Sequence, residues 1–180
     1  ADGTFTPFTR EGAGNNFLSN QIKAIAHDGG TLWVGSDQGV SVFSEASQTF
    51  QFPVTNQGGQ LPDIRVQDVA VGGGLVYVAT PQGVAVRRAD NTWTTLRRAT
   101  NGWPNSTGSD FARAVSWDGE GVWVMLADSQ RQPAGVLLRR VGLDPLPENS
   151  EGGDIVHVYT PENAGLVASK GRNGVSLEWT

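Results

Sequence analysis

The chain has 180 residues, a net charge of −5 and a sequence pI of about 4.9, with 24 glycines and no cysteine. The missing cysteine excludes disulfides, thiolate metal sites and cysteine nucleophiles. The acidic balance argues against a nucleic-acid partner, because an acidic surface repels phosphate backbones at long range. No apolar run reaches the roughly 18 residues of a membrane span, so we expect no transmembrane segment within this chain.

A repeat with a period of 44 residues organises the first half of the chain, where residues 20–44 align with residues 64–88 without a gap. Identical residues recur in turns and strand centres, for example at Gly29/Gly73, Val34/Val78, Gln38/Gln82 and Gly39/Gly83. A period in this range, carried by short strands and glycine turns, is typical of radial or stacked repeat folds.

Each of the first two units predicts four strands. The first unit predicts strands at 21–26, 31–35, 40–43 and 49–54, and the second at 65–71, 75–80, 84–88 and 92–97. Asp-Gly and Gly-Gly steps between them supply the positive φ angles that tight hairpins require. The segment Leu32–Val34 is apolar on both faces, which predicts a strand buried from both sides, as between stacked sheets.

Two further units follow with larger departures. The third predicts strands at 112–117, 122–124 and 135–138, followed by a poor strand at 143–147 that holds Pro145 and Pro147. The fourth predicts strands at 155–159, 165–169 and 174–177, with 155–159 innermost. The expected single domain, 1–180, is then divided into units 15–58, 59–102, 103–153 and 154–180, and residues 1–14 complete the last unit.

The two ends of the chain are expected to meet. Residues 4–8 resemble the fourth-strand segment 49–53, and an N-terminal strand that completes the last blade closes the ring of many propellers. The sequence therefore predicts an all-β fold, a β-propeller of about four blades in which each blade is a four-stranded antiparallel sheet. The alternative is a fragment of a larger propeller.

Two stretches of the first unit, Leu18–Ile25 and Leu32–Val40, resemble the two-component-regulator propeller repeat. Proteins with this repeat include the periplasmic sensor portions of hybrid histidine kinases, whose blades bind ligands or partners. The resemblance implies a blade without a catalytic motif to carry over. It favours a periplasmic or extracellular location, as does Ala1, because alanine is typical of the residue left by signal-peptide cleavage.

Few residues could carry chemistry. The glycines lie singly or in hairpin turns, outside any strand–loop–helix context, and no run has the alternating carboxylates of a calcium loop. We therefore expect no catalytic residue, cofactor or metal. Asp68 and His157 align on the innermost strands of opposite blades, which predicts a polar pair near the channel. The alternative is that each side chain bonds backbone within its own blade.

One basic pattern exceeds background. Two arginine pairs close the third strands of neighbouring blades, and a third pair lies on the strand expected beside the first; the residues are Arg87, Arg88, Arg139, Arg140, Arg97 and Arg98. We expect these arginines to cluster on one rim and to dock on an acidic partner or anionic head groups. The alternative is a solvated edge whose charges prevent aggregation.

A second candidate surface is the face of long loops over the channel, where propeller ligands commonly bind. Trp103, Arg131 and Arg172 lie in these loops. Exposed tryptophan and arginine dominate the energetics of many interfaces, so these three residues are predicted partner contacts.

Together these features favour a non-catalytic binding or scaffold propeller that is exported and docks on a larger protein assembly, with a membrane surface as one setting. One alternative is a periplasmic sensor or ligand-binding propeller, and another is a propeller lyase or hydrolase, since propellers host all three. The expected partner is a protein or a membrane-associated complex and not a nucleic acid.

Overall fold

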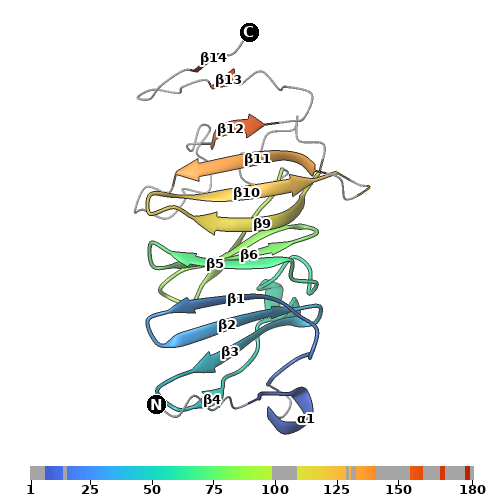
Figure 1. The fold of residues 1–180 in the computed structure, drawn as a ribbon, viewed down its shortest axis with the longest axis vertical. Helices are drawn as coiled ribbons and strands as arrows, with labels where there is room; N and C mark the ends of the chain where they lie inside the picture. Colours follow the sequence, from blue (N-terminus) through green and yellow to red (C-terminus); the bar gives the residue numbers. More distant parts are fainter. Residues whose placement is uncertain are drawn as a thin grey trace.

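Strands and tight turns dominate the fold (Figure 1), and the computed structural model describes residues 7–13, 16–98, 109–128, 130, 133–140, 155–159, 167–168 and 177–178. These residues form three four-stranded antiparallel sheets and one two-stranded sheet. The helical segments of the described ranges are α1 (Arg10–Ala13) and the 3-10 turn η1 (Gln57–Gly59). The predicted all-β class and the four-stranded blades are confirmed.

The strands follow the repeat closely in the first two blades. The first blade is β1 (Ile22–Asp28), β2 (Thr31–Ser36), β3 (Gly39–Ser44) and β4 (Thr49–Phe50). The second blade is β5 (Asp68–Gly72), β6 (Leu75–Thr80), β7 (Gly83–Arg87) and β8 (Trp93–Leu96). The third blade contains β9 (Phe111–Trp117), β10 (Gly121–Ala127), β11 (Pro133–Arg140) and β12 (Ile155–Tyr159).

The three blades fan out from their first strands. β5 lies between β1 and β9, while the first and third blades extend from this centre in opposite directions (Figure 1). An apolar layer fills each space between blades. The first contains Trp33, Val40, Val66, Val69 and Val78, and the second contains Tyr77, Val84, Val115, Val122 and Leu126. The strand predicted to be buried on both faces is so, since Trp33 and Val34 are both buried.

Glycines let the blades approach closely. A Cβ atom at Gly35 of the first blade would lie 2.6 Å from Cγ1 of Val66, and one at Gly72 of the second blade would lie 2.0 Å from Cγ of Trp117. Trp117 stacks on Tyr77 with 6.1 Å between ring centroids and 15° between planes. Small residues on one blade therefore receive large residues of the next.

The predicted fourth unit is wrong at its first strand. β12 pairs with β11 and is the outermost strand of the third blade, not the innermost strand of another. The sequence supplies the reason, because the prolines of 143–147 cannot donate ladder hydrogen bonds whereas 155–159 can. β13 (Val167–Ala168) and β14 (Leu177–Glu178) pair with each other, and β13 lies near β12.

Closure of the ring by the N-terminal strand is not shown. Phe8 packs against Phe43 and Phe50 of the first blade, with centroids 5.3 Å and 5.6 Å away, while residues 1–6 lie outside the described ranges. Within those ranges, no strand pairing joins the N-terminal segment to β13 or β14. The described part of the chain is a propeller-like fan.

Candidate functional site

The two ends of the blades carry different chemistry. β1, β5 and β9 begin at one end, which we call the start end, and turn into β2, β6 and β10 at the other, which we call the hairpin end (Figure 1). The turns from the second to the third strand, 36–39 and 80–83, also lie at the start end. In the first two blades, the surface of the start end is therefore formed by the beginning of the first strand and by the turn between the second and third strands.

A polar side chain anchors the approach to each first strand. Ser19, Asp63 and Ser109 accept a hydrogen bond from the backbone N–H two residues later, at 3.0 Å, 2.9 Å and 3.0 Å. Such local bonds from serine and aspartate favour a turn over a continued strand. In all three blades the same kind of side-chain hydrogen bond therefore fixes the backbone just before the first strand.

Buried hydroxyls hold the second turn of the first two blades. Ser36 donates to the carbonyl of Gly39 at 2.9 Å, and Thr80 donates to that of Gly83 at 2.8 Å. Both glycines have positive φ, 124° and 121°. A Cβ atom at either position would lie 2.5 Å from a backbone carbonyl oxygen, so only glycine fits this turn.

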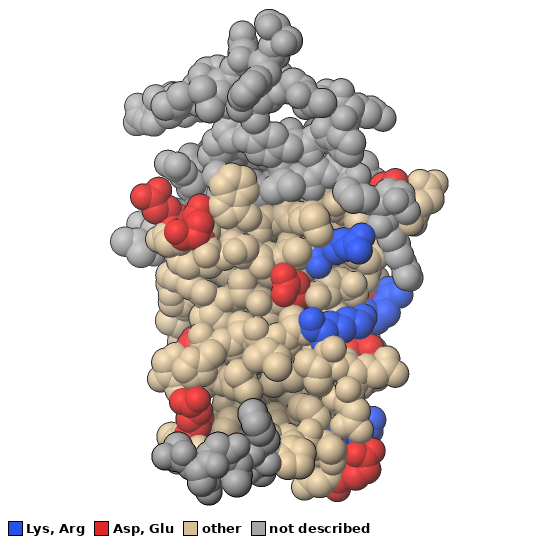
Figure 2. Space-filling view, in the orientation of Figure 1, with Lys and Arg blue, Asp and Glu red and all other residues tan. Residues whose placement is uncertain are grey.

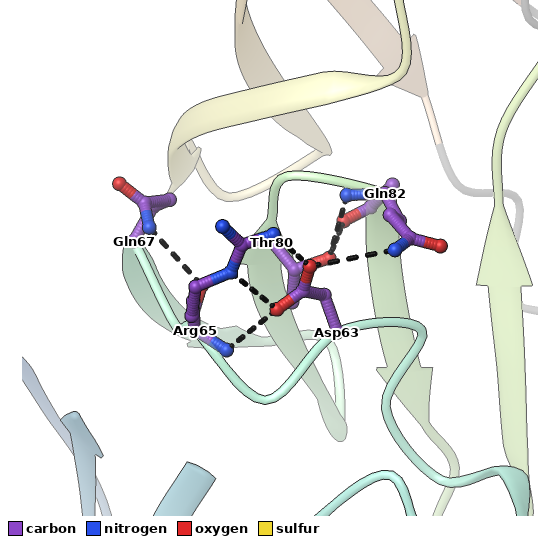
Figure 3. Close-up of polar contacts among 6 residues, drawn as sticks. Asp63, Arg65, Gln67, Thr80 and Gln82 are labelled. Atoms are coloured by element: carbon purple, nitrogen blue, oxygen red, sulfur yellow. Dashed lines mark hydrogen bonds and ion pairs between the residues drawn. The ribbon is translucent and has the colours of Figure 1, made fainter. Parts of the chain in front are cut away.

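An arginine–carboxylate pair distinguishes the start end of the second blade (Figure 3). The Nε and Nη2 atoms of Arg65 donate to the two carboxylate oxygens of Asp63 at 3.0 Å and 2.6 Å. Gln82, from the second turn, donates to the same carboxylate at 3.5 Å. The Asp63 side chain is 7% exposed and that of Arg65 is 53% exposed. The buried acid thus holds an arginine that faces solvent.

This pairing favours the charged form of both side chains. Hydrogen bonds from the Arg65 side chain lower the pKa of Asp63, which outweighs the opposing effect of burial. The hydrogen bond from Arg65 to Asp63 likewise raises the pKa of Arg65. Both charges are therefore held at neutral pH, and the pair serves to position the guanidinium.

The predicted Asp68–His157 pair is wrong. Asp68 begins β5, whereas His157 lies opposite Leu138 on β12, at the outer edge of the third blade. The error follows from assigning 155–159 to an innermost strand. Asp68 instead accepts the backbone N–H of Val69 at 2.9 Å, within its own blade as the alternative expected. It also accepts that of Val115 on β9 at 3.0 Å, which the alternative did not expect and which joins the second and third blades.

The predicted arginine cluster is separated by strand direction. Arg87 lies opposite Trp93, at the hairpin end, whereas Leu96 lies opposite Val84 at the start end. Arg97 and Arg98 follow Leu96, so these two arginines sit at the opposite end of the sheet from Arg87. Antiparallel strands place the end of one beside the start of the next. The end of β8, which Arg97 and Arg98 follow, therefore lies beside the start of β7 and not beside its end at Arg87.

The remaining arginine pairs share an end as expected, but not one role. Arg139 and Arg140 lie opposite Val122 and Gly121, at the hairpin end of the third blade, and their backbone alone is described. The guanidinium carbon of Arg87 lies 5.1 Å from the centroid of the Trp33 ring, which is cation–π distance. Arg87 of the second blade therefore contacts Trp33 of the first blade, whereas the neighbouring Arg88 is half-buried.

Exposed charge separates by end across the three blades and their turns. At the start end the exposed charged residues of the blades themselves are basic, namely Lys23, Arg65 and Arg113, while α1 beside this end carries exposed Arg10 and Glu11, and Glu11 accepts from Asn20 at 3.1 Å. At the hairpin end they are acidic: Glu45, Asp90, Asp118 and Glu120, besides His27, which lies 3.1 Å from Glu45. Figure 2 shows the blue atoms along the side on which β1, β5 and β9 begin, whereas red atoms lie on both sides.

The contribution of Arg98 is smaller. Its Nε atom lies 3.5 Å from Asp110, which offsets its charge at the start end. Trp103, Arg131 and Arg172, the predicted loop contacts, lie outside the described residues. Within the described ranges no group of three or more potential metal ligands occurs, and no helix is long and apolar enough to cross a membrane.

Sequence reasoning missed the Asp63–Arg65 pair. The gapless repeat was aligned from Ile64 onward, one residue after Asp63. Extending it by one residue sets Asp63 opposite Ser19, and so in an anchoring position, whereas Arg65 already lies opposite Gln21 within the alignment. The signal was therefore an acid and an arginine two residues apart at a repeat position that is polar in each blade.

Comparison with known proteins supports the fold. No family model matches the chain, and no curated protein matches it either. Among solved structures, the extracellular domain of the putative hybrid two component system BT4673 from B. thetaiotaomicron is similar with a TM-score of 0.57 at 15% identity, covering 82% of this chain and 19% of its own. That of BT3049 from the same organism gives 0.55 at 13% identity, covering 93% and 22%.

These similarities show the architecture alone, because the identities are low. A further structure of the BT4673 extracellular domain, there described as a putative one component system, gives a TM-score of 0.53 at 14% identity and covers 67% of this chain. The chain spans only 16% to 22% of the length of these structures. It therefore corresponds to a few neighbouring blades of much longer domains.

Proposed function

We propose that this protein is a non-catalytic binding module that works outside the cytoplasm and docks on an acidic protein partner through the start end of its blades. The observation that supports this most is the separation of exposed charge within the strands and turns of the three blades, with Lys23, Arg65 and Arg113 at one end and four exposed acids at the other. A field of one sign over one end steers an oppositely charged partner and orients it as it arrives.

Arg65 is the proposed central contact of this surface. Asp63 holds its guanidinium through two hydrogen bonds, so little side-chain freedom remains to be lost when a partner binds. Within the described residues its Nη1 atom makes no hydrogen bond, and half of the side chain faces solvent. Lys23 and Arg113 add positive charge at the same end, which contributes to the long-range attraction.

The extracellular location is supported by the similar structures, which are extracellular domains, and by the resemblance of the first unit to the regulator repeat. A sensor that binds a small ligand remains the alternative function on the same ground. A lyase or hydrolase has less support, because His157 lies on the outermost strand of the third blade and is not paired with Asp68. The scaffold role within a larger or membrane-associated assembly is part of the proposal.

The hairpin end offers a second docking surface, because Arg88 follows β7 there and Arg139 and Arg140 have their backbone at the same end of β11. One experiment separates the two. Binding of a fluorescent polyglutamate peptide is measured by anisotropy for the wild-type protein and for Lys23→Glu, Arg113→Glu and Arg88→Glu. Each substitution changes the net charge by the same amount, so differences between variants report position and not total charge.

We expect Lys23→Glu and Arg113→Glu each to weaken binding about fivefold, as for a loss near 1 kcal/mol, and Arg88→Glu to change it little. The affinity should also fall at about 0.15 M ionic strength, where the screening length is ~8 Å. A loss confined to Arg88→Glu would move the proposed surface to the hairpin end. Equal binding by every variant would contradict docking by acidic partners at either end.

A further inference from the structure

Each blade has two faces that meet its neighbours. The face toward the next blade, here the front face, carries an aromatic residue of the second strand: Trp33, Tyr77 or Trp123. The face toward the preceding blade, here the back face, carries aliphatic residues from the first strand and its approach. In the second blade these are Val66 and Val69, which approach Gly35 of the first blade, and in the third they are Ala112 and Val115.

The back face of the first blade is uncovered at these same positions. Val66 and Val69 are 0% and 5% exposed, and Ala112 and Val115 are 0% and 6% exposed. The equivalent residues of the first blade, Ile22 and Ile25, are 37% and 62% exposed. Two large aliphatic side chains thus face solvent at a position where each following blade places a buried contact.

The described residues of the N-terminal segment, 7–13 and 16–21, cover the outer part of this face. Phe8 packs on Phe43 and Phe50, and Phe17 lies 4.9 Å from Phe50, centroid to centroid. These contacts lie over β3 and β4. The inner part, on β1, keeps Ile25 exposed, so the segment acts as a partial cover and leaves the space beside β1 open.

Among the described residues, a complementary face is partly exposed at the other end of the fan. Trp123 is partly exposed, although Trp33 and Tyr77 are 3% and 1% exposed at the same repeat position. Its orientation matches that of Trp33, because the indole N–H of Trp123 donates to Asp118 at 2.7 Å as that of Trp33 donates to Asp28 at 3.4 Å. Trp123 is thus held in the pose that, in the first blade, receives another blade.

We propose that these two open faces bind each other between two copies of this chain, head to tail, with β1 of one copy seated on the Trp123 face of the other. The contact would repeat the geometry that already joins β1 to β5 and β5 to β9. Such a contact uses two different patches, so it continues into a ring or a filament unless the geometry stops it.

The described C-terminal strands do not supply the missing cover. β13 lies near β12, the outermost strand of the third blade, and β14 pairs with β13. Neither is adjacent to β1 in the fan (Figure 1). A second copy is therefore the occupant whose complementary face is itself present in the structure.

The test measures association by sedimentation velocity over a wide range of protein concentration. Ile25→Asp removes the back-face contact, and Trp123→Ser removes the front-face contact, with Met125→Glu as a second front-face variant. Phe52→Asp is the matched control, because Phe52 is an exposed aromatic that follows the outermost strand β4, away from β1 and β10. Circular dichroism checks that each variant keeps its strands.

The wild-type protein and Phe52→Asp should associate as concentration rises, and each face variant should bind its own kind at least about tenfold more weakly, a loss near 1.4 kcal/mol. An equimolar mixture of Ile25→Asp and Trp123→Ser should form a dimer, because each retains the face that the other lacks. A wild-type protein that stays monomeric would overturn the proposal. So would unchanged association of Ile25→Asp, or a mixture that remains monomeric while both variants are folded.

Discussion

The two spaces between blades share one backbone repeat but are filled differently. In the first, Trp33 packs against the aliphatic residues of the second blade and lies under Arg87. In the second, Tyr77 stacks on Trp117, which lies where the second blade has Val71, and Gly72 leaves room for that indole. The comparison teaches that residue volumes are matched across each interface and not position by position along the repeat.

The largest effect on this comparison is expected from a side chain at position 72 that occupies the space of the Trp117 indole. Gly72→Val places atoms within the indole, so we expect a loss of about 3 kcal/mol in the free energy of unfolding, at the upper range of overpacking effects. Trp117→Val, which copies the second blade, should partly restore the stability of Gly72→Val. Urea unfolding of both single variants and the double variant measures this coupling, and additive losses would contradict matched volumes.

A second substitution examines what the blades have in common. Gly83→Ala and Gly39→Ala should each cost about 2 kcal/mol, because each adds a methyl group at positive φ against a backbone oxygen. Gly74→Ala is the control, since its φ is also positive, at 75°, but no atom lies within 4 Å of the added Cβ. Thermal unfolding should rank the first two together and below the control; a control as damaging as Gly83→Ala would show that φ alone matters.

The third prediction concerns a feature found in the second blade alone among the three. The pKa of Asp63 is lowered in the folded protein, so its contribution is present above the ordinary pKa of about 3.9 and is lost as pH falls below it. Asp63→Asn should therefore cost about 1.5 kcal/mol near pH 7, and less at acid pH. Urea unfolding at both pH values tests this, and a difference independent of pH would exclude the ionised carboxylate as the cause.

The smallest effect is expected in the first interface. Arg87→Met keeps an apolar stem over Trp33 but removes the cation, which should cost about 0.5–1 kcal/mol. A double-mutant cycle with Trp33→Leu isolates the contact between the two side chains, and Arg88→Met provides the control at the neighbouring residue. Zero coupling energy in the cycle would assign Arg87 to its contact with Asn91 instead.

The sequence predicted most strands of the first two blades because their hydrophobic pattern and glycine turns are local. The position of 155–159 could not be predicted this way, since an apolar segment fits an inner or an outer strand equally and only its partner decides. The Arg97–Arg98 error had a different origin, because strand direction was known and only its consequence was missed. Asp63 needed an alignment one residue longer, since the repeat as aligned begins at Ile64.

The central place of β5, with β1 on one side and β9 on the other, has a consequence for how the protein opens. When units contact only their neighbours, local opening begins at the outer units and the middle one opens last. Amide hydrogens in the second blade should therefore exchange with deuterium more slowly than those in β1 and β9. Protection from exchange that is greatest at Val78 and Val84, both fully buried, and decreases toward the first and third blades would identify the second blade as the most stable of the three.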